Sequence, residues 1–280
     1  MADLLETNLI HISDLHLHII PTRISHFRGK RVLGAVNLLL RRRRAYPRAR
    51  ALGLVRLLDE MKWDHLVITG DLTQLGLEEE FDLARQVLAP LLERGPGRVT
   101  ILPGNHDRYD WPFLTRDWFS MYFGEFFQGG EITTRELTPH WHLAGWDSTR
   151  LTHPIMADGL VRPETLKATG CWITELPQGS RVMVANHFPL AFPPPRHSRW
   201  HHDLRNIPQV LDWMADQPVD VYLHGHMHHN WVVEQTLGGR PVRFVNSASS
   251  TQVLPPGEPS SFHRVVLAGR EARVIPHLLG

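Results

Sequence analysis

Val99–Asp107, with the sequence VTILPGNHD, begins as an apolar run and ends in three consecutive polar side chains. The run Val99–Leu102 is typical of a buried strand, and the Pro-Gly pair that follows predicts a turn. The polar side chains after the turn are Asn105, His106 and Asp107. Because open α/β sheets place their sites at the carboxyl ends of strands, we expect this stretch to contribute to a site at a sheet edge.

The same pattern, an apolar run followed by His, Asp or Asn, occurs at four further places. The runs are Leu9–Ser13, His65–Thr69, Val182–Ala185 and Val219–Leu223. The polar residues after them include Asp14, His16, Asp71, His187, His226 and His228. Collected at one sheet edge, these residues offer imidazole, carboxylate and amide donors without a thiolate. Such a set suits divalent cations of intermediate hardness, such as manganese, iron, cobalt, nickel or zinc.

In order along the chain, these motifs resemble the five blocks of the calcineurin-like metallophosphoesterase superfamily. The blocks are Asp14-x-His16, Gly70-Asp71, Gly104-Asn105-His106-Asp107, His187 and Gly225-His226-x-His228. Each block alone is weakly specific, whereas the ordered set is strongly specific. Within the superfamily, the chain is most similar to the bacterial class III cyclic-nucleotide phosphodiesterase-like proteins. The segments that carry this similarity are Asp14–Leu17, Thr69–Thr73, Leu102–Asp107 and Gly145–Ser148.

The resemblance implies an α/β fold, a four-layer α-β-β-α sandwich of two mixed β-sheets flanked by helices. We expect one domain over residues 1–280, with a basic insertion at about residues 22–50, since no repeat, low-complexity segment or linker divides the chain. Helical spacing predicts further helices at Arg48–Met61, Glu78–Leu92, Pro163–Leu176 and Ile207–Gln217. Trp111–Phe127 holds an aromatic stripe that we expect in the core, and the residues after Trp231 alternate as in β-hairpins.

The resemblance also implies a dinuclear metal centre in which Asp71 bridges the two cations. Asp14, His16 and His228 would complete one site, and Asn105, His187 and His226 the other. Two divalent cations about 4 Å apart can hold a bridging hydroxide as the nucleophile for in-line displacement at phosphorus. Manganese or iron is the expected metal, with zinc, cobalt or nickel as alternatives.

By the same resemblance, His106 is not a ligand but faces the leaving group, as a general acid or as a donor to the phosphate. Asp107 is expected to hold the tautomer of His106 by accepting from a ring nitrogen. Taken singly, each of these residues is more simply a hydrogen-bonded turn residue. The ordered set, taken together, favours the metal site.

Sequence spacing fits this ligand set locally. Asp14 and His16 are two residues apart on a segment expected to be extended, so their side chains would point the same way. His226 and His228 repeat that spacing, and Gly225 would let the backbone pass close to the metals.

Composition limits the function classes. The chain of 280 residues has 30 Lys or Arg against 29 Asp or Glu, a net charge of +1, which gives no nucleic-acid signature. Its single cysteine, Cys171, excludes an intrachain disulfide framework and predicts a reducing, cytoplasmic compartment. The N-terminal residues lack the pattern of a signal peptide, and no stretch is long enough to be a transmembrane helix.

One basic segment stands out against this balanced charge. Leu17–Leu58 contains no acidic residue but eleven Lys or Arg, with four consecutive arginines at Arg41–Arg44. Apolar residues at helical spacing predict a basic amphipathic helix here: Val32, Leu33, Val36, Leu39 and Leu40. The stretch Arg28–Arg50 either contacts an anionic membrane or a phosphate-bearing substrate, or is a solvated helix whose arginines keep the protein soluble.

The leading prediction is therefore a cytoplasmic phosphodiesterase that hydrolyses a small-molecule phosphodiester. The alternative is a pyrophosphatase or phosphodiesterase at the inner membrane surface, acting on a lipid precursor as UDP-diacylglucosamine pyrophosphatases of the superfamily do. The long insertion after His16 departs from the short segment expected there and speaks against a small nucleotide. A non-catalytic scaffold of the same fold would predict missing ligands, and none is missing.

Overall fold

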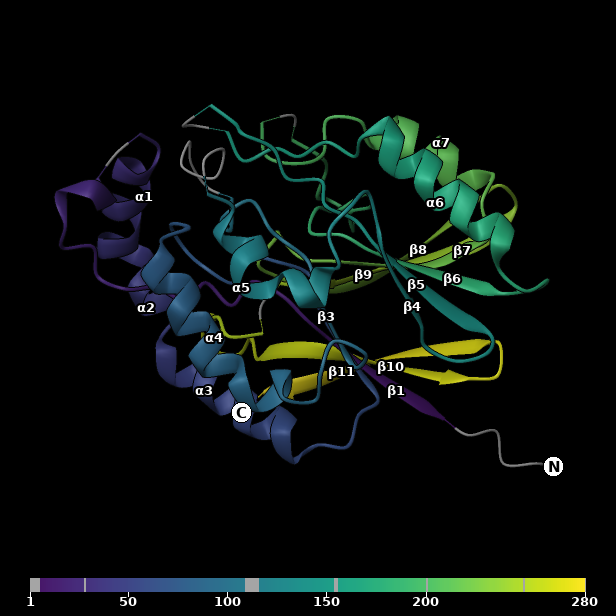
Figure 1. The fold of residues 1–280 in the computed structure, drawn as a ribbon, viewed down its shortest axis with the longest axis horizontal. Coiled ribbons are helices and arrows are strands. Elements are labelled where there is room, and N and C mark those ends of the chain that lie inside the picture. The colour runs from purple at the N-terminus through teal and green to yellow at the C-terminus, as the bar shows by residue number, and fades with distance from the viewer. Residues whose placement is uncertain are drawn as a thin grey trace.

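Two mixed β-sheets lie face to face in the computed structural model of the chain, with helices over their outer faces (Figure 1). The structure describes residues 6–27, 29–108, 116–153, 156–199, 201–248 and 250–279. One sheet has five strands in the order β11-β10-β1-β2-β3, and the other has six in the order β4-β5-β6-β7-β9-β8. This is the α-β-β-α sandwich expected from the sequence, so the predicted fold class is confirmed.

The five-stranded sheet is built around three parallel strands whose carboxyl ends share one edge. They are β1 (Thr7–Ile12), β2 (His65–Ile68) and β3 (Val99–Ile101). The C-terminal hairpin, β10 (Ser260–Ala268) and β11 (Glu271–Leu279), extends the sheet with β10 antiparallel to β1. Each of the three parallel strands ends one residue earlier than predicted, because the chain turns there into a polar loop.

Four strands of the second sheet are also parallel to one another. They are β5 (Trp141–Gly145), β6 (Arg181–Ala185), β7 (Val219–His224) and β9 (Arg240–Ser247). An antiparallel strand closes each edge: β4 (Thr133–Glu136) pairs with β5, and β8 (Asn230–Leu237) pairs with β9. The carboxyl ends of β6 and β7 therefore project their loops in one direction, as those of β1–β3 do.

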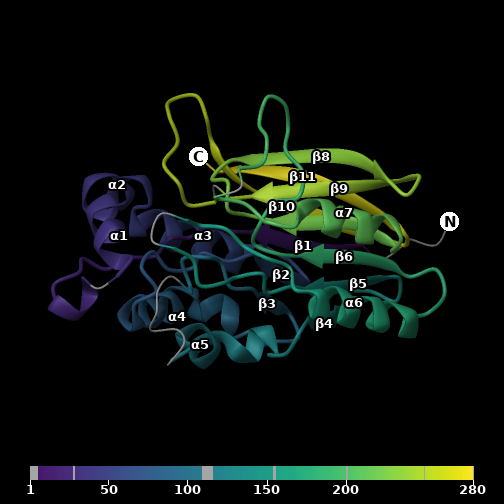
Figure 2. The same ribbon diagram turned by 90° about the horizontal axis from the view of Figure 1, so that it is seen from above.

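Among the described residues, helices α3 to α7 cover the sheets (Figures 1 and 2). α3 (Arg48–Glu60), α4 (Glu78–Leu92) and α5 (Trp118–Phe127) pack on the five-stranded sheet, and α6 (Pro163–Glu175) and α7 (Ile207–Ala215) on the other. The core between the sheets includes fully buried apolar side chains from both, such as Leu9 and Leu223, together with a buried polar cluster of His11, Thr69, Ser247 and His263. The aromatic stripe of α5 is buried as predicted, although residues 109–115, which include the start of the predicted segment, lie outside the described residues.

The basic segment forms a helical projection beside the sheets (Figure 1). It follows a short 3-10 turn, η1 (Ile24–His26), and comprises α1 (Arg31–Asn37), a π-helical turn η2 (Leu38–Arg42) and α2 (Arg43–Ala45). We call residues 31–45 the α1–α2 segment; Arg28, at the start of the predicted basic stretch, lies outside the described residues. Within the described part of the chain, no helix combines the length and the apolar character needed to cross a bilayer.

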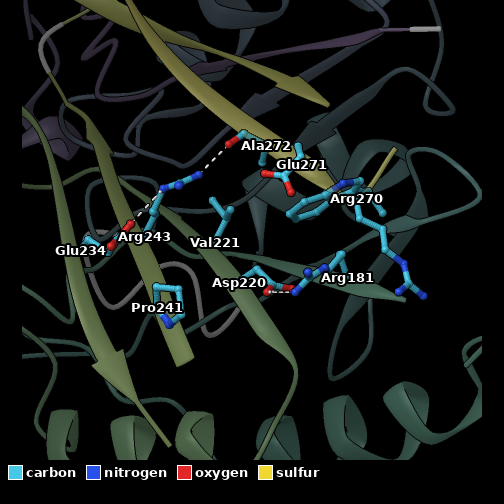
Figure 3. Close-up of a pocket in the computed structure, with 10 residues that line it drawn as sticks. Arg181, Asp220, Val221, Glu234, Pro241, Arg243, Arg270, Glu271 and Ala272 are labelled. Atoms are coloured by element: carbon cyan, nitrogen blue, oxygen red, sulfur yellow. Dashed lines mark hydrogen bonds and ion pairs between the residues drawn. The ribbon is translucent and has the colours of Figure 1, made fainter. Parts of the chain in front are cut away.

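A hollow of about 220 Å³ lies at the opposite end of the strands from the predicted ligands (Figure 3). It is lined at the amino ends of β6 and β7 by Arg181 and Asp220, which form an ion pair of 2.8 Å. Arg243 and Glu234 form a second pair of 3.2 Å on its wall. Because these opposite charges neutralise each other, the hollow does not compete with the polar strand ends as a candidate site.

Candidate metal centre

The loops after five strands bring the predicted ligands together between the carboxyl ends of the two sheets. Asp14 and His16 follow β1, Asp71 follows β2, Asn105 follows β3, His187 follows β6, and His226 and His228 follow β7. Among the described residues, the donor atoms form three groups that could hold a metal ion. The groups are Asp14, His16, Asp71 and His228; Asp71, His187 and His226; and His202, Asp203 and His226. The first two groups share Asp71.

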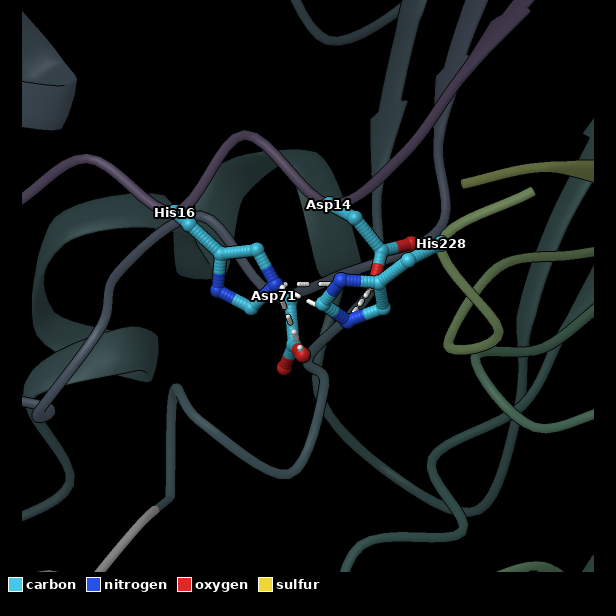
Figure 4. A group of neighbouring side chains, drawn as sticks. All are labelled: Asp14, His16, Asp71 and His228. Atoms are coloured by element: carbon cyan, nitrogen blue, oxygen red, sulfur yellow. Dashed lines mark hydrogen bonds and ion pairs between the residues drawn. The ribbon is translucent and has the colours of Figure 1, made fainter. Parts of the chain in front are cut away.

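In the first group, four side chains converge on a common point (Figure 4). The Nε2 atom of His16 lies 3.3 Å from Nε2 of His228 and 3.7 Å from Oδ1 of Asp14. Oδ2 of Asp71 lies 3.7 Å from the same His16 nitrogen, and Oδ1 of Asp14 lies 3.5 Å from His228 Nε2. One cation could accept donors from all four side chains.

The second group meets the first at Asp71. Its Oδ2 atom lies 3.5 Å from Nε2 of His187, which lies 3.1 Å from Oδ1 of Asn105 and 3.2 Å from Nδ1 of His226. The same carboxylate oxygen therefore faces both groups. This is the position that a carboxylate shared between two cations requires.

The two carboxylates show that the site fits cations. Oδ2 of Asp14 accepts from the backbone N–H of His226 at 2.9 Å, and Oδ1 of Asp71 accepts from that of His106 at 2.8 Å. Their other oxygens, Asp14 Oδ1 and Asp71 Oδ2, are buried and have no hydrogen-bond partner among the described residues. An unpaired buried carboxylate oxygen is costly, and a bound cation would remove that cost.

Hydrogen bonds outside the cluster orient the imidazoles. Nδ1 of His187 lies 2.7 Å from the Thr69 carbonyl, and Nε2 of His226 lies 2.7 Å from the His202 carbonyl. Because a carbonyl only accepts, these nitrogens donate their protons, and the opposite ring nitrogens face the cluster. Tyr46 makes the corresponding contact through its hydroxyl to Nδ1 of His228.

The charge states in the cluster suit metal binding. Burial holds the pKa of His16, His226 and His228 well below the ordinary value, so these rings are neutral and keep a lone pair. Burial alone would also lower the pKa of His187, but the Asp71 carboxylate raises it to about 9. A cation that binds His187 therefore displaces a proton.

The backbone at the ligands is left-handed, and the predicted extended geometry is wrong. Among the described non-glycine residues, six have positive φ, and five of them are predicted ligands. These are Asp14 (57°), His16 (46°), Asp71 (53°), His226 (74°) and His228 (54°). The side chains of each closely spaced pair converge because of this backbone twist. Such conformations are uncommon for residues with a Cβ atom and concentrate at functional sites.

Two glycines let the ligand loops approach one another. A Cβ atom on Gly225 would overlap Ser13 Oγ and Asp14 Oδ2, and one on Gly104 would overlap the backbone N and Oδ1 of Asp71. Close approach by Gly225 was predicted, and the structure shows that the contact is with the Asp14 loop.

His106 and Asp107 differ from the prediction in how they interact. Nδ1 of His106 lies 2.6 Å from the Gln74 carbonyl, which takes the orienting role expected of Asp107. The Asp107 carboxylate instead accepts from the backbone N–H groups of Thr73 at 2.9 Å and Gly104 at 2.9 Å. The expectation that Asp107 holds the His106 tautomer is therefore wrong, because its oxygens tie the Asp71 loop to the Asn105 loop.

The α1–α2 segment contributes Arg42 to the centre, and Tyr46, which directly follows the segment, also reaches it; from the sequence we expected the basic stretch to contact a membrane or a phosphate but singled out neither residue. Nη1 of Arg42 lies 3.0 Å from Nε2 of His16, and Tyr46 is buried against His228. The sequence showed a run of four arginines but not which one points inward. Leu38, Arg42 and Tyr46 are spaced by four residues, so one helical face carries all three, and this phase could have identified Arg42.

The loop before α7 adds His202, which matches none of the five sequence blocks. Its Nδ1 atom lies 3.0 Å from Nε2 of His226 and 3.0 Å from Oδ1 of Asp203. The carbonyl of the same residue accepts from His226, as described above. His202 thus supports the ligand set from outside it.

Comparison with known proteins identifies a family. Residues 7–230 match the model of the calcineurin-like phosphoesterase family. A comparison with curated protein sequences found no match. The chain resembles the solved structure of a dimetal phosphatase from Danio rerio, with a TM-score of 0.65 and 14% identity over 98% of this chain and 99% of that one.

Two further solved structures share the fold over part of their length. The purple acid phosphatase PPD1 from yellow lupin (Lupinus luteus) seeds has a TM-score of 0.58 at 10% identity, over 98% of this chain and 51% of that one. The NAD nucleotidase of Haemophilus influenzae has a TM-score of 0.50 at 13% identity, over 98% and 50%. At these identities the likeness concerns the fold, whereas the family match spans most of the sequence. The chain belongs to the calcineurin-like phosphoesterase family and is a metal-dependent phosphoric ester hydrolase.

Proposed function

We propose that the chain is a dinuclear metallophosphodiesterase and that its domain spans residues 1–280. Asp14, His16 and His228 would hold one cation, Asn105, His187 and His226 would hold the other, and Asp71, which belongs to both groups, would serve both. One observation carries this proposal: the buried Oδ2 atom of Asp71, which makes no hydrogen bond among the described residues, faces both groups of donors. The cited dimetal phosphatase, which shares the fold, supports a centre with two metals.

The donor set favours manganese or iron as the metals, because it consists of carboxylates, neutral imidazoles and one amide. Zinc, cobalt and nickel are the alternatives to compare in the same assay. When bound, two such cations would neutralise charge on the phosphoryl group and lower the pKa of coordinated water. The remaining chemistry belongs to the side chains around them.

His106 is the proton donor in this proposal. Its Nδ1–H is engaged by the Gln74 carbonyl, so Nε2 is the ring nitrogen that can exchange a proton with a leaving oxygen. The ring lies edge-on to His16 with 4.9 Å between ring centroids, which places it beside the first group. Burial lowers the pKa of His106 to about 4, so the ring needs the negative charge of a bound phosphate beside it to hold a second proton.

Arg42 is the phosphate-binding residue. Its guanidinium donates to the His16 lone pair that a cation would use, so Arg42 must withdraw from that nitrogen when metal binds. The charge then remains at the edge of the centre, where it can pair with a non-bridging phosphate oxygen. A single arginine matches the single negative charge of a phosphodiester.

The choice of a diester rests on the resemblance of the Thr69–Thr73 and Leu102–Asp107 motifs to the class III phosphodiesterase-like branch. A cytoplasmic location is proposed on the single cysteine, Cys171, which is unpaired and exposed. The substrate would be a small phosphoester.

Hydrolysis by metal-stripped protein resupplied with manganese tests the proposal. Bis-p-nitrophenyl phosphate, p-nitrophenyl phosphate, cyclic AMP and a UDP-linked acyl sugar are compared side by side. We expect manganese-dependent cleavage, faster for the diester than for the monoester, and loss of bound metal in Asp71→Asn. Two bound metals with preferred cleavage of the monoester would overturn the diester assignment, and full activity of Asp71→Asn would overturn the bridging role.

A second candidate is a hydrolase that cleaves a pyrophosphate or phosphodiester in a lipid precursor. One observation favours it: the segment that brings Arg42 to the centre also exposes apolar side chains outward. In the same assay, faster cleavage of the UDP-linked acyl sugar than of cyclic AMP would select this candidate.

A further inference from the structure

We propose that the α1–α2 segment docks the protein onto the surface of an anionic lipid bilayer. The inference concerns a surface and does not depend on which phosphoester is cleaved. Among the described residues, twelve large apolar side chains are exposed, and eight of these lie between Ile20 and Leu40. The exposed apolar surface is thus concentrated in one short part of the chain.

These side chains form a stripe on one helical face. Their exposed fractions are 42% for Val32, 54% for Leu33, 51% for Val36, 37% for Leu39 and 70% for Leu40. An amphipathic helix of a globular protein normally turns such a stripe toward the core. Here the buried face instead carries Gly34, Ala35 and Leu38, and the larger apolar residues face outward.

Contacts on the inner face fix this orientation. Arg31 donates to the carbonyls of Leu75 at 3.1 Å and Gly76 at 2.9 Å. Ala35 and Leu38, 0% and 1% exposed, pack in a small cluster that includes Leu75. The helix therefore cannot roll its apolar stripe inward without breaking these buried contacts.

Charge next to the stripe matches an anionic surface. Arg41, Arg43 and Arg44 directly follow the last apolar residue and are exposed. No acidic residue occurs between Leu17 and Leu58 to neutralise them within the segment. Apolar side chains that enter the acyl boundary while arginines meet lipid phosphates are the features of an interfacial helix.

The shape and charge of the segment favour a bilayer over a second copy of the chain. The α1–α2 segment lies at the periphery, beyond the ends of the strands (Figure 2), so it is a projection rather than a groove. A symmetric dimer through this face would bring the exposed arginines of both copies together, which is unfavourable. Because Arg42 on the same segment reaches His16, docking would hold the metal centre close to the lipid head groups.

Co-sedimentation of the full chain with vesicles tests the proposal. The vesicles contain phosphatidylcholine alone or with one quarter phosphatidylglycerol, at low and high salt. We expect the protein to pellet with the anionic vesicles, with binding weakened by salt. A triple variant that carries Leu33→Gln, Val36→Gln and Leu40→Gln should bind the anionic vesicles at least about tenfold more weakly than the native protein. The same loss is expected for a second triple variant, which carries Arg41→Gln, Arg43→Gln and Arg44→Gln.

A matched control substitutes exposed apolar residues elsewhere: Met121→Gln, Val232→Gln, Leu278→Gln, which are 67%, 44% and 64% exposed in the native chain. This control should bind vesicles as the native protein does, and all three triple variants should keep native circular dichroism. The proposal is overturned if native protein stays in the supernatant with anionic vesicles, or if the apolar variant still binds. A concentration-dependent dimer that the apolar variant loses, without vesicle binding, would assign the face to a second copy instead.

Discussion

His106 and Asp107 are neighbours in the chain, but we expect His106 to donate a proton and Asp107 to hold two ligand loops together. Substitution of His106 should separate these two roles. His106→Ala removes the ring held by the Gln74 carbonyl but leaves the Asp107 contacts between the two ligand loops intact. We expect both metals to stay bound while kcat on a phosphodiester with a poor leaving group falls about 10²–10⁴-fold. Metal content by mass spectrometry and steady-state kinetics measure the two effects, and near-normal kcat would exclude proton donation by His106.

Substitution of Arg42 should weaken substrate binding without weakening metal binding. Arg42→Gln removes a cation that competes for the His16 lone pair, so affinity for manganese should stay equal or rise. The KM for the diester should rise about tenfold or more, because a charge-assisted contact with the phosphate is lost. Titration calorimetry and kinetics test this, with exposed Arg44→Gln as the control. Weaker metal binding in Arg42→Gln would instead make Arg42 a structural support of His16.

Strands β2 and β10 each bury a histidine away from the metal centre, and these should make stability depend on pH. Burial lowers the pKa of His65 to about 3 and that of His263 to about 4. Their neutral rings lie 2.9 Å from Thr100 Oγ1 and 2.8 Å from Ser247 Oγ. Below pH 6.5 the unfolded chain gains protons that the folded chain excludes, so the free energy of unfolding falls as the pH decreases toward 4.

At pH 5 this loss is about 2 kcal/mol for each histidine. Urea unfolding at pH 7 and pH 5, with chelator present to exclude metal effects, should show it. His263→Gln should lose about 2 kcal/mol less than the native chain over this interval, whereas exposed His140→Gln should lose as much as the native chain. An equal pH dependence in native protein and His263→Gln would show that His263 titrates normally.

Some features of the structure could be predicted from local sequence, and others could not. α4 has the predicted bounds, Glu78–Leu92, because acidic residues at its start and an apolar stripe both act within the helix. The clustering of the predicted ligands followed from strand ends that parallel topology gathers at one edge. The orientation of α1 could not be predicted from the sequence, because periodicity identifies an amphipathic helix but not whether its apolar side faces the core. The inward position of Arg42 depends on that same orientation, and the Gln74 carbonyl that orients His106 carries no sequence signal.

Each of the two sheets supplies part of the metal centre, so bound metal should stabilise the folded arrangement of both sheets. Asp14, His16, Asp71 and Asn105 come from the five-stranded sheet, and His187, His226 and His228 from the other. The sheets also share a buried core, and Ser247 contacts His11 and His263 of the opposite sheet across it, so we expect the fold to persist without metal. Free metal at a hundred times its Kd adds about 2.7 kcal/mol to the free energy of unfolding for each site.

Chelation should therefore lower the midpoint of thermal unfolding while the far-ultraviolet circular dichroism at 25 °C stays unchanged. Added manganese should restore the midpoint, and Asp71→Asn should respond neither to chelator nor to manganese. An unchanged midpoint in the native chain would show that the folded chain does not bind the cations.

The left-handed backbone at five predicted ligands limits how this centre can evolve. At φ between 46° and 74°, asparagine, aspartate, histidine and glycine fit most readily, whereas β-branched residues are strained. A randomised library selected for altered metal preference should therefore return those four residue types at Asp14, Asp71 and His226. New specificity is therefore more accessible through the α1–α2 segment, which carries Arg42, than through the predicted ligands themselves.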